Sequence, residues 1–302
     1  MIALLAPGQG SQTPGMLSPW LELPGTADRL AIWSKASGLD LARLGTTATA
    51  EEITDTAVTQ PLVVAAALLA FEELDRRGEV PADLVAAGHS VGELAAAAIA
   101  GVISADDAVA LAALRGSEMA KACALEPTGM SAVLGGDEEA VLARLDELGL
   151  APANRNAAGQ IVAAGLLSAL DELAANAPEK ARVRALPVAG AFHTRFMAPA
   201  QDAVTEAASR ISPSEPTRTL LSNSDGQPVT SGADALAKLA AQVTKPVRWD
   251  LCSAYLRSAE VSAVVELPPA GTLVGIAKRE IKGTPTLALK TPDDLAGLAE
   301  FT

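Results

Sequence analysis

A serine between two glycines, in the pattern Gly-x-Ser-x-Gly at residues 88–92, is the stretch of this sequence best suited to covalent chemistry. An apolar run at residues 83–87, typical of a buried strand, precedes it, and an alanine-rich run typical of a helix follows at 93–100. This strand, sharp turn and helix predict a nucleophile elbow that exposes the hydroxyl of Ser90. The amide of Val91, at the start of the helix, would face negative charge developing on a substrate oxygen. The alternative is a Gly-Ser turn that only joins two elements.

A serine hydroxyl needs a base to take its proton, and the chain contains 2 histidines. His89 is next to the serine, where we expect its ring to point away from the nucleophile. His193 is therefore the expected base, unless it is a structural histidine. No aspartate stands out as a partner for its ring, so we expect a backbone carbonyl or a side-chain amide to hold it. Ordinary α/β-hydrolases place the histidine last, whereas a long segment follows His193 here.

Arg115 is a candidate for binding a carboxylate. Ser104 followed by two aspartates predicts the start of a helix after the elbow helix, and Arg115 lies on it. A guanidinium in a cleft can hold a carboxylate with two parallel hydrogen bonds. The alternative is a surface arginine near a helix end.

A glycine-rich loop at residues 7–12 follows the apolar run at 2–6, which we expect to be the first strand and not a signal peptide. The loop lacks the Lys-Ser/Thr ending of a phosphate-binding loop. Its glycines let the backbone approach a ligand and leave amides free to donate. A simple turn after an edge strand is the alternative.

Composition excludes several classes of function. The 302 residues are 49% hydrophobic with a net charge of −13, which argues against nucleic acid or an anionic membrane as partner. The 2 cysteines are isolated, without metal-ligand spacing, as in proteins of a reducing compartment. The apolar run at 94–102 is too short to span a bilayer, and we expect no other stretch to do so. We therefore expect a cytoplasmic protein with no metal.

Alternating strands and helices predict an α/β fold with a mainly parallel sheet. Between residues 127 and 189 the pattern becomes βαββαβ, which indicates a small inserted subdomain of the split-βαβ type. We therefore assign 1–126 and 190–302 to a large domain. In this domain we expect a buried helix at 60–77, a late strand at 261–267 and a final helix at 273–281.

Six stretches along the chain form a recognisable series: Pro7–Gln12, Gly88–Glu93, Arg115-Gly116 with Met119, Asn154–Gln160, Gly190–His193 and Pro246–Trp249. In this order they resemble the malonyl-CoA:acyl carrier protein transacylases of fatty acid synthesis, which are close relatives of polyketide synthase acyltransferase domains. The resemblance covers nearly the whole chain and implies an α/β-hydrolase-like large domain with a ferredoxin-like insert. Ala6, Ala191 and Thr194 depart from the common family residues, without removing a catalytic group.

The resemblance also implies a role for individual residues. Ser90 would be the acylated nucleophile and His193 its base. The amides of Gln9 and Val91 would form the oxyanion hole, and Arg115 would bind the malonyl carboxylate. The backbone carbonyl of Gln242 would orient the histidine, and the aromatic ring of Phe192 would disfavour methylmalonyl. The side chains that would line the cleft are Met119, Asn154 and Asn156.

The implied reaction is ping-pong, needs no cofactor and uses malonyl-CoA and an acyl carrier protein as partners of a monomeric enzyme. Because the carrier protein is acidic, docking needs a local basic patch, for which Lys278 and Arg279, with Lys282, are the candidates. The alternative for these residues is a solvated helix end. For the whole chain the alternatives are an acyltransferase serving a polyketide synthase, a thioesterase, and a non-catalytic docking module.

Overall fold

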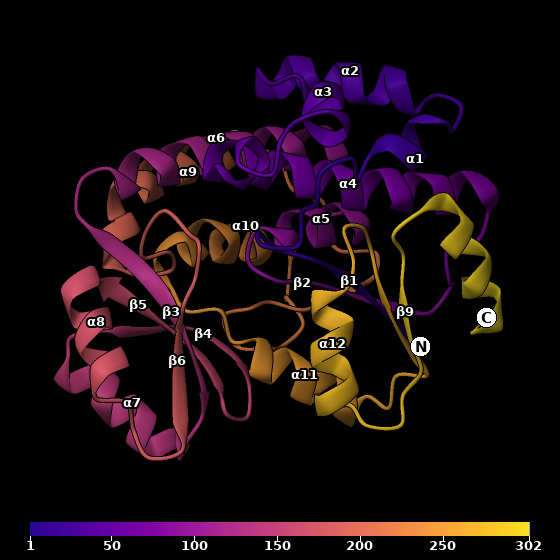
Figure 1. Cartoon of the computed structure of the whole chain (residues 1–302). Coiled ribbons are helices and arrows are strands. Elements are labelled where there is room, and N and C mark those ends of the chain that lie inside the picture. The colour runs from indigo at the N-terminus through magenta and orange to yellow at the C-terminus, as the bar shows by residue number, and fades with distance from the viewer. Residues whose placement is uncertain (302) are drawn as a thin grey trace.

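The computed structural model describes residues 1–301 and contains two sheets, each with its own helices (Figure 1). The larger sheet has five strands in the order β7-β2-β1-β8-β9, and every neighbouring pair is parallel. In that order the strands are Thr219–Leu220, Leu84–Gly88, Ile2–Ala6, Ala263–Glu266 and Thr286–Ala288. The predicted α/β class and mainly parallel sheet are confirmed.

The register of the central strands positions the site. Ala6, at the end of β1, is the partner of Gly88 at the end of β2. Because both strands end level, the loop after β1 and the elbow after β2 lie together at the carboxyl edge of the sheet. Ligands of open parallel sheets bind at this edge.

Both faces of the larger sheet are buried, as near-continuous apolar strands require. Leu4 of β1 packs into the core on one face and Leu5 into the core on the other. Helices α4, α5 and α6 cover the first face, and α11 and α12 cover the second (Figure 1). These helices span Thr56–Arg77, Gly92–Ile99, Ala105–Cys123, Trp249–Ser258 and Thr272–Glu280.

The remaining helices of the large domain surround this arrangement. The α-helices are α1 (Ser18–Leu21), α2 (Thr26–Ser37), α3 (Leu41–Thr46), α9 (Ala198–Ala208) and α10 (Gly232–Ala241). The short 3-10 helices are η1 (Glu52–Thr54), η2 (Arg195–Met197), η3 (Gln242–Thr244) and η4 (Pro292–Glu300).

The smaller sheet has four antiparallel strands in the order β4-β5-β3-β6. Together with two helices it gives the predicted βαββαβ sequence, and it has a separate apolar core that includes Val133, Leu145 and Leu173. Its elements are β3 (Thr128–Gly135), α7 (Glu138–Glu147), β4 (Ala151–Ala157), β5 (Gln160–Leu166), α8 (Leu167–Ala175) and β6 (Ala181–Ala185). We call this unit the small subdomain.

Strand β4 joins the small subdomain to the large domain. The amide of Arg155 donates to the carbonyl of Val247 at 2.9 Å, and the amide of Val247 donates to the carbonyl of Ala153 at 2.9 Å. Trp249 packs against the ring of His89, whose Nε2 lies 2.9 Å from Oδ1 of Asn156. The stretch Pro246–Trp249 thus ties the two units together beside the elbow.

Helix α4 is long and apolar enough to cross a membrane by length and composition, which contradicts the prediction that no stretch of the chain meets this criterion. Within the fold, 78% of its most apolar window is buried. It packs against both α5 and α6 as a core helix, so its apolar character reflects burial within the protein.

Other elements were not predicted from the sequence. Strands β7 and β9 are edge strands of 2 and 3 residues, too short for a periodic pattern. Helix α11 begins at Trp249, the last residue of the Pro-Val-Arg-Trp stretch, for which the sequence analysis predicts no helix. The helix expected to be final is α12, but β9 and η4 follow it.

Candidate active site

The elbow depends on its two glycines because there is no space for a side chain at either. A Cβ on Gly88 would lie 2.0 Å from the carbonyl carbon of Gly92, and one on Gly92 would lie 2.3 Å from the carbonyl oxygen of Ala6. Ser90 has a φ of 54°, a left-handed conformation that is unfavourable for a residue with a side chain. Its amide donates to Oδ1 of Asn223 at 2.8 Å, which helps to hold this conformation.

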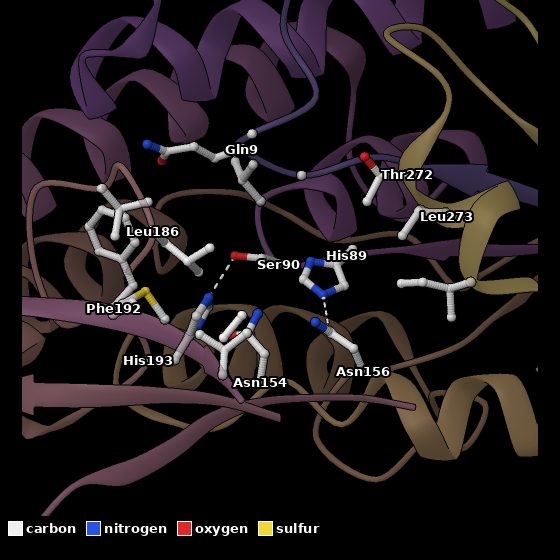
Figure 2. A pocket seen from close by; sticks show the side chains of 18 of the residues that line it. Gln9, His89, Ser90, Asn154, Asn156, Leu186, Phe192, His193, Thr272 and Leu273 are labelled. Atoms are coloured by element: carbon white, nitrogen blue, oxygen red, sulfur yellow. Dashed lines mark hydrogen bonds between the residues drawn. The ribbon is translucent and has the colours of Figure 1, made fainter. Parts of the chain in front are cut away.

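Ser90 and His193 meet as a nucleophile and a base. The Oγ of Ser90 lies 2.7 Å from Nε2 of His193 (Figure 2). Nδ1 of His193 lies 2.9 Å from the backbone carbonyl oxygen of Gln242. A carbonyl oxygen can only accept, so Nδ1 carries the proton and Nε2 is free to accept from the serine hydroxyl. Burial, with a contribution from the charge of Arg115, lowers the pKa of His193 to about 3. The ring is therefore neutral at neutral pH.

The two predicted oxyanion donors lie on adjacent loops beside Ser90. Gln9 follows β1, and Val91 immediately precedes α5. Neither backbone amide has an acceptor among residues 1–301. Gly8 allows the close approach of the loops, since a Cβ there would lie 2.6 Å from the carbonyl oxygen of His89. Both amides are thus available to a substrate oxygen.

Arg115 is a buried cation, not a surface arginine. It is 2% exposed, and its guanidinium donates to Oε1 of Gln60 at 2.6 Å and to Oε1 of Gln242 at 3.1 Å. One nitrogen also lies 3.4 Å from Oγ of Ser90. Burial lowers the pKa of Arg115 to about 10, so it remains charged at neutral pH. In the described part of the chain, no carboxylate is within ion-pair distance of it.

A cavity of about 500 Å³ opens over Ser90, between the large domain and the small subdomain. Figure 2 shows Gln9, Phe192 and Asn154 around the serine, and Met119 also lines the cavity. Asn154 is 8% exposed, and its Oδ1 has no hydrogen-bond partner among the described residues. A buried acceptor of this kind fits a donor on a bound molecule.

The ring of His89 points away from the nucleophile, as expected, toward Asn156 (Figure 2). Asn156 also lines the cavity, and its Oδ1 is already engaged by the ring of His89. Lys278 and Arg279 are exposed in the last turn of α12. Arg279 lines the cavity and donates to Oε1 of Gln160 in the small subdomain at 2.8 Å.

Three residues close to the site had no predicted role. Gln60 lies in a helix that the sequence predicts to be almost uniformly apolar. Its side-chain amide, the single one in that helix, is the sequence feature that could have marked it. Asn223 belongs to no recognisable motif, yet it holds both the amide of Ser90 and the carbonyl of Gly88. Glu93 ended the elbow motif and received no assignment.

The fold and this site define an acyltransferase. The chain matches the family model described as acyl transferase domain over residues 4–291, and it belongs to that family.

The most informative relatives carry one name. The malonyl CoA-acyl carrier protein transacylase of Mycobacterium tuberculosis is 70% identical over 302 residues, covering 100% of each chain. The protein of the same name from Escherichia coli is 32% identical over 307 residues, covering 99% of each.

Solved structures agree with this assignment of the fold. The crystal structure of MCAT from Mycobacterium tuberculosis aligns with a TM-score of 0.97 at 70% identity, covering 99% of each chain. A malonyl-transacylase in complex with a type II PKS acyl-carrier protein aligns with a TM-score of 0.91 at 29% identity, covering 100% of this chain and 99% of the other.

Proposed function

We propose that this chain transfers the malonyl group of malonyl-CoA to the phosphopantetheine thiol of an acyl carrier protein, supplying extender units for fatty acid synthesis. The observation that carries the proposal is Arg115, a buried cation without a carboxylate partner among residues 1–301, 3.4 Å from the nucleophilic oxygen of Ser90. Such a cation fits a substrate with a free carboxylate close to its reacting carbonyl. The names of the relatives support the same activity.

In the first half-reaction, Oγ of Ser90 attacks the thioester carbonyl carbon while Nε2 of His193 takes its proton. The amides of Gln9 and Val91 stabilise the oxyanion. The C–S bond then breaks, His193 returns the proton to the CoA sulfur, and a malonyl-serine ester remains. The neutral imidazole that the carbonyl of Gln242 orients is the form this step requires.

Malonyl binding itself strengthens the base. The charge of Arg115 is one of the causes that lower the pKa of His193. A malonyl carboxylate paired with Arg115 offsets that charge and makes protonation of the ring less unfavourable. Acyl groups without a carboxylate lack this effect, so selection acts on the chemical step as well as on binding.

In the second half-reaction the carrier thiol gives its proton to His193 and attacks the ester, so that Ser90 recovers its hydrogen and malonyl leaves on the carrier. No cofactor is required. The basic side chains of Lys278 and Arg279 beside the cavity suit an acidic carrier. Phe192 and Met119 would limit the space around the malonyl group. We further propose that the enzyme acts in the cytoplasm as a monomer.

Intact-protein mass spectrometry after brief exposure to malonyl-CoA tests the function. We expect a malonyl adduct on the wild type and on Ser258→Ala, an exposed serine that does not line the cavity, and none on Ser90→Ala. The adduct should transfer to added holo carrier protein. Free malonate accumulating without an adduct would instead identify a thioesterase, and no reaction at all would leave a non-catalytic docking module.

A polyketide carrier is the second candidate acceptor. The observation in its favour is the solved relative whose partner is a type II PKS acyl-carrier protein. Comparing transfer from the malonyl-enzyme to purified fatty acid and polyketide carriers distinguishes the two acceptors, because the first half-reaction is common to both.

A further inference from the structure

Glu93 is a buried carboxyl group that the mechanism above does not use. It lies in the first turn of α5, three residues after Ser90, and is 5% exposed. No basic side chain among residues 1–301 is within ion-pair distance of it. An acidic residue kept in such a position needs other hydrogen-bond donors.

Both oxygens of Glu93 accept hydrogen bonds from residues that hold the catalytic pair. Oε1 accepts from the backbone amide of Asn223 at 2.7 Å, and Oε2 accepts from Nε2 of Gln242. Asn223 binds the amide of Ser90 through Oδ1 at 2.8 Å. Gln242 binds Nδ1 of His193 through its backbone carbonyl at 2.9 Å. One carboxylate therefore connects the supports of the nucleophile and of the base.

From this convergence we propose that Glu93 is a positioning residue for acyl transfer, which fixes Asn223 and Gln242 and through them the distance between Ser90 and His193. The inference rests on the proposed function.

The direction of each hydrogen bond makes a carboxylate specifically suitable at this position. Arg115 can only donate, so it requires Oε1 of Gln242, and the amide nitrogen of Gln242 must then face Glu93. The backbone amide of Asn223 is also a donor. Both oxygens of residue 93 must therefore accept. A glutamine there would place one amide nitrogen against a second donor.

The ionised form of Glu93 fits both donors, which gives the proposal a pH signature. Burial raises the pKa of Glu93 to about 8, and the charge of Arg115 opposes this increase. The other ionisable groups near it are Asp225, which raises the pKa of Glu93 further, and the thiol of Cys252, whose own pKa burial raises well above this range. His193 does not titrate in this range. We expect kcat/KM for acylation to rise with pH up to about 8 in the wild type.

The experiment compares Glu93→Gln with a control and a partner swap. Glu73→Gln is the control, because Glu73 is a similarly buried acid, 6% exposed, paired with Arg76 and Arg77 at the far end of α4. The swap combines Glu93→Gln with Gln242→Glu, which restores a donor opposite an acceptor and keeps an acceptor toward Arg115.

We measure single-turnover acylation by malonyl-CoA across pH 6–9, together with thermal unfolding. We expect Glu93→Gln to lower the maximal acylation rate by about 10²-fold, as displacement of a reacting group does. It should also abolish the rise of the acylation rate with pH up to about 8. Glu73→Gln should keep both the maximal rate and this pH dependence. The swap should recover part of the maximal rate but raise KM, since the new carboxylate competes with malonyl for Arg115.

Unchanged acylation by Glu93→Gln would overturn the proposal. So would a rate loss in Glu93→Gln and Glu73→Gln that follows only the unfolded fraction of each. Failure of the proposed function is distinguishable, because the wild type itself would then form no malonyl-enzyme.

Discussion

The two walls of the cavity differ in how their polar groups are used. On the large-domain wall, Ser90, His193 and Arg115 each have hydrogen-bond partners that fix their geometry. On the small-subdomain wall, apolar side chains such as Val162 alternate with amides, and Oδ1 of Asn154 has no partner among the described residues.

This difference indicates that the large domain carries out the chemistry, whereas the small subdomain helps to bind the substrate. Every group assigned to bond making lies on the large domain, at the carboxyl edge of the parallel sheet, where neighbouring loops must meet. The small subdomain adds no titratable group to the cavity lining and leaves an acceptor for the bound molecule. Substitutions on the first wall should change which acyl group reacts and how fast, whereas those on the second should change affinity.

The largest effect is expected from Arg115→Ala. Loss of two charge-assisted hydrogen bonds should lower kcat/KM for malonyl-CoA by about 10²–10³-fold, while acylation by acetyl-CoA changes little. Stopped-flow acylation with both thioesters measures this ratio. Arg218→Ala, at a partly buried arginine that does not line the cavity, is the control. An equal loss for both thioesters would contradict the role of Arg115 in selecting malonyl.

An intermediate effect is expected at the rim of the cavity. Lys278→Glu with Arg279→Glu should raise KM for the carrier protein by about 10-fold at low salt, because complementary charges aid encounter with an acidic partner. Steady-state transfer at two ionic strengths measures it. The control is Lys35→Glu with Arg210→Glu, which makes the same change in net charge at exposed sites elsewhere. Equal effects of the two pairs would rule out a local docking patch.

The smallest effect is expected from Asn154→Ala. Removing one uncharged acceptor should raise KM for malonyl-CoA by about 2–10-fold and leave the maximal acylation rate unchanged. Single-turnover acylation at several malonyl-CoA concentrations separates the two quantities. A fall in the maximal rate approaching that of Arg115→Ala would show that the small-subdomain wall takes part in the chemistry.

The parts of the site that could be predicted from sequence are those encoded in short contiguous stretches. The elbow needs only residues 88–92, because its glycines and its strand-to-helix context are local. The βαββαβ insert was recognisable because each of its elements is long enough to show a period. Edge strands β7 and β9 could not be recognised in the same way, because strands of 2 and 3 residues are too short to show an alternation of apolar and polar residues.

The roles of individual residues needed either the family resemblance or the fold. Spacing alone left Arg115 between a ligand-binding residue and a surface residue, and its burial resolves that choice. His193 was favoured because histidines are scarce, and its 2.7 Å approach to Ser90 supports that interpretation.

Short contiguous motifs and local periodicity are enough to predict the nucleophile, the class of fold and the family. What holds the catalytic groups in place depends on tertiary contacts. Every residue carries a backbone carbonyl, so no residue type could mark Gln242 as the partner of His193 without the resemblance. Asn223 and Glu93 likewise acquire their roles from the packing of distant segments, which turns ordinary polar side chains into buried groups with obligatory hydrogen bonds.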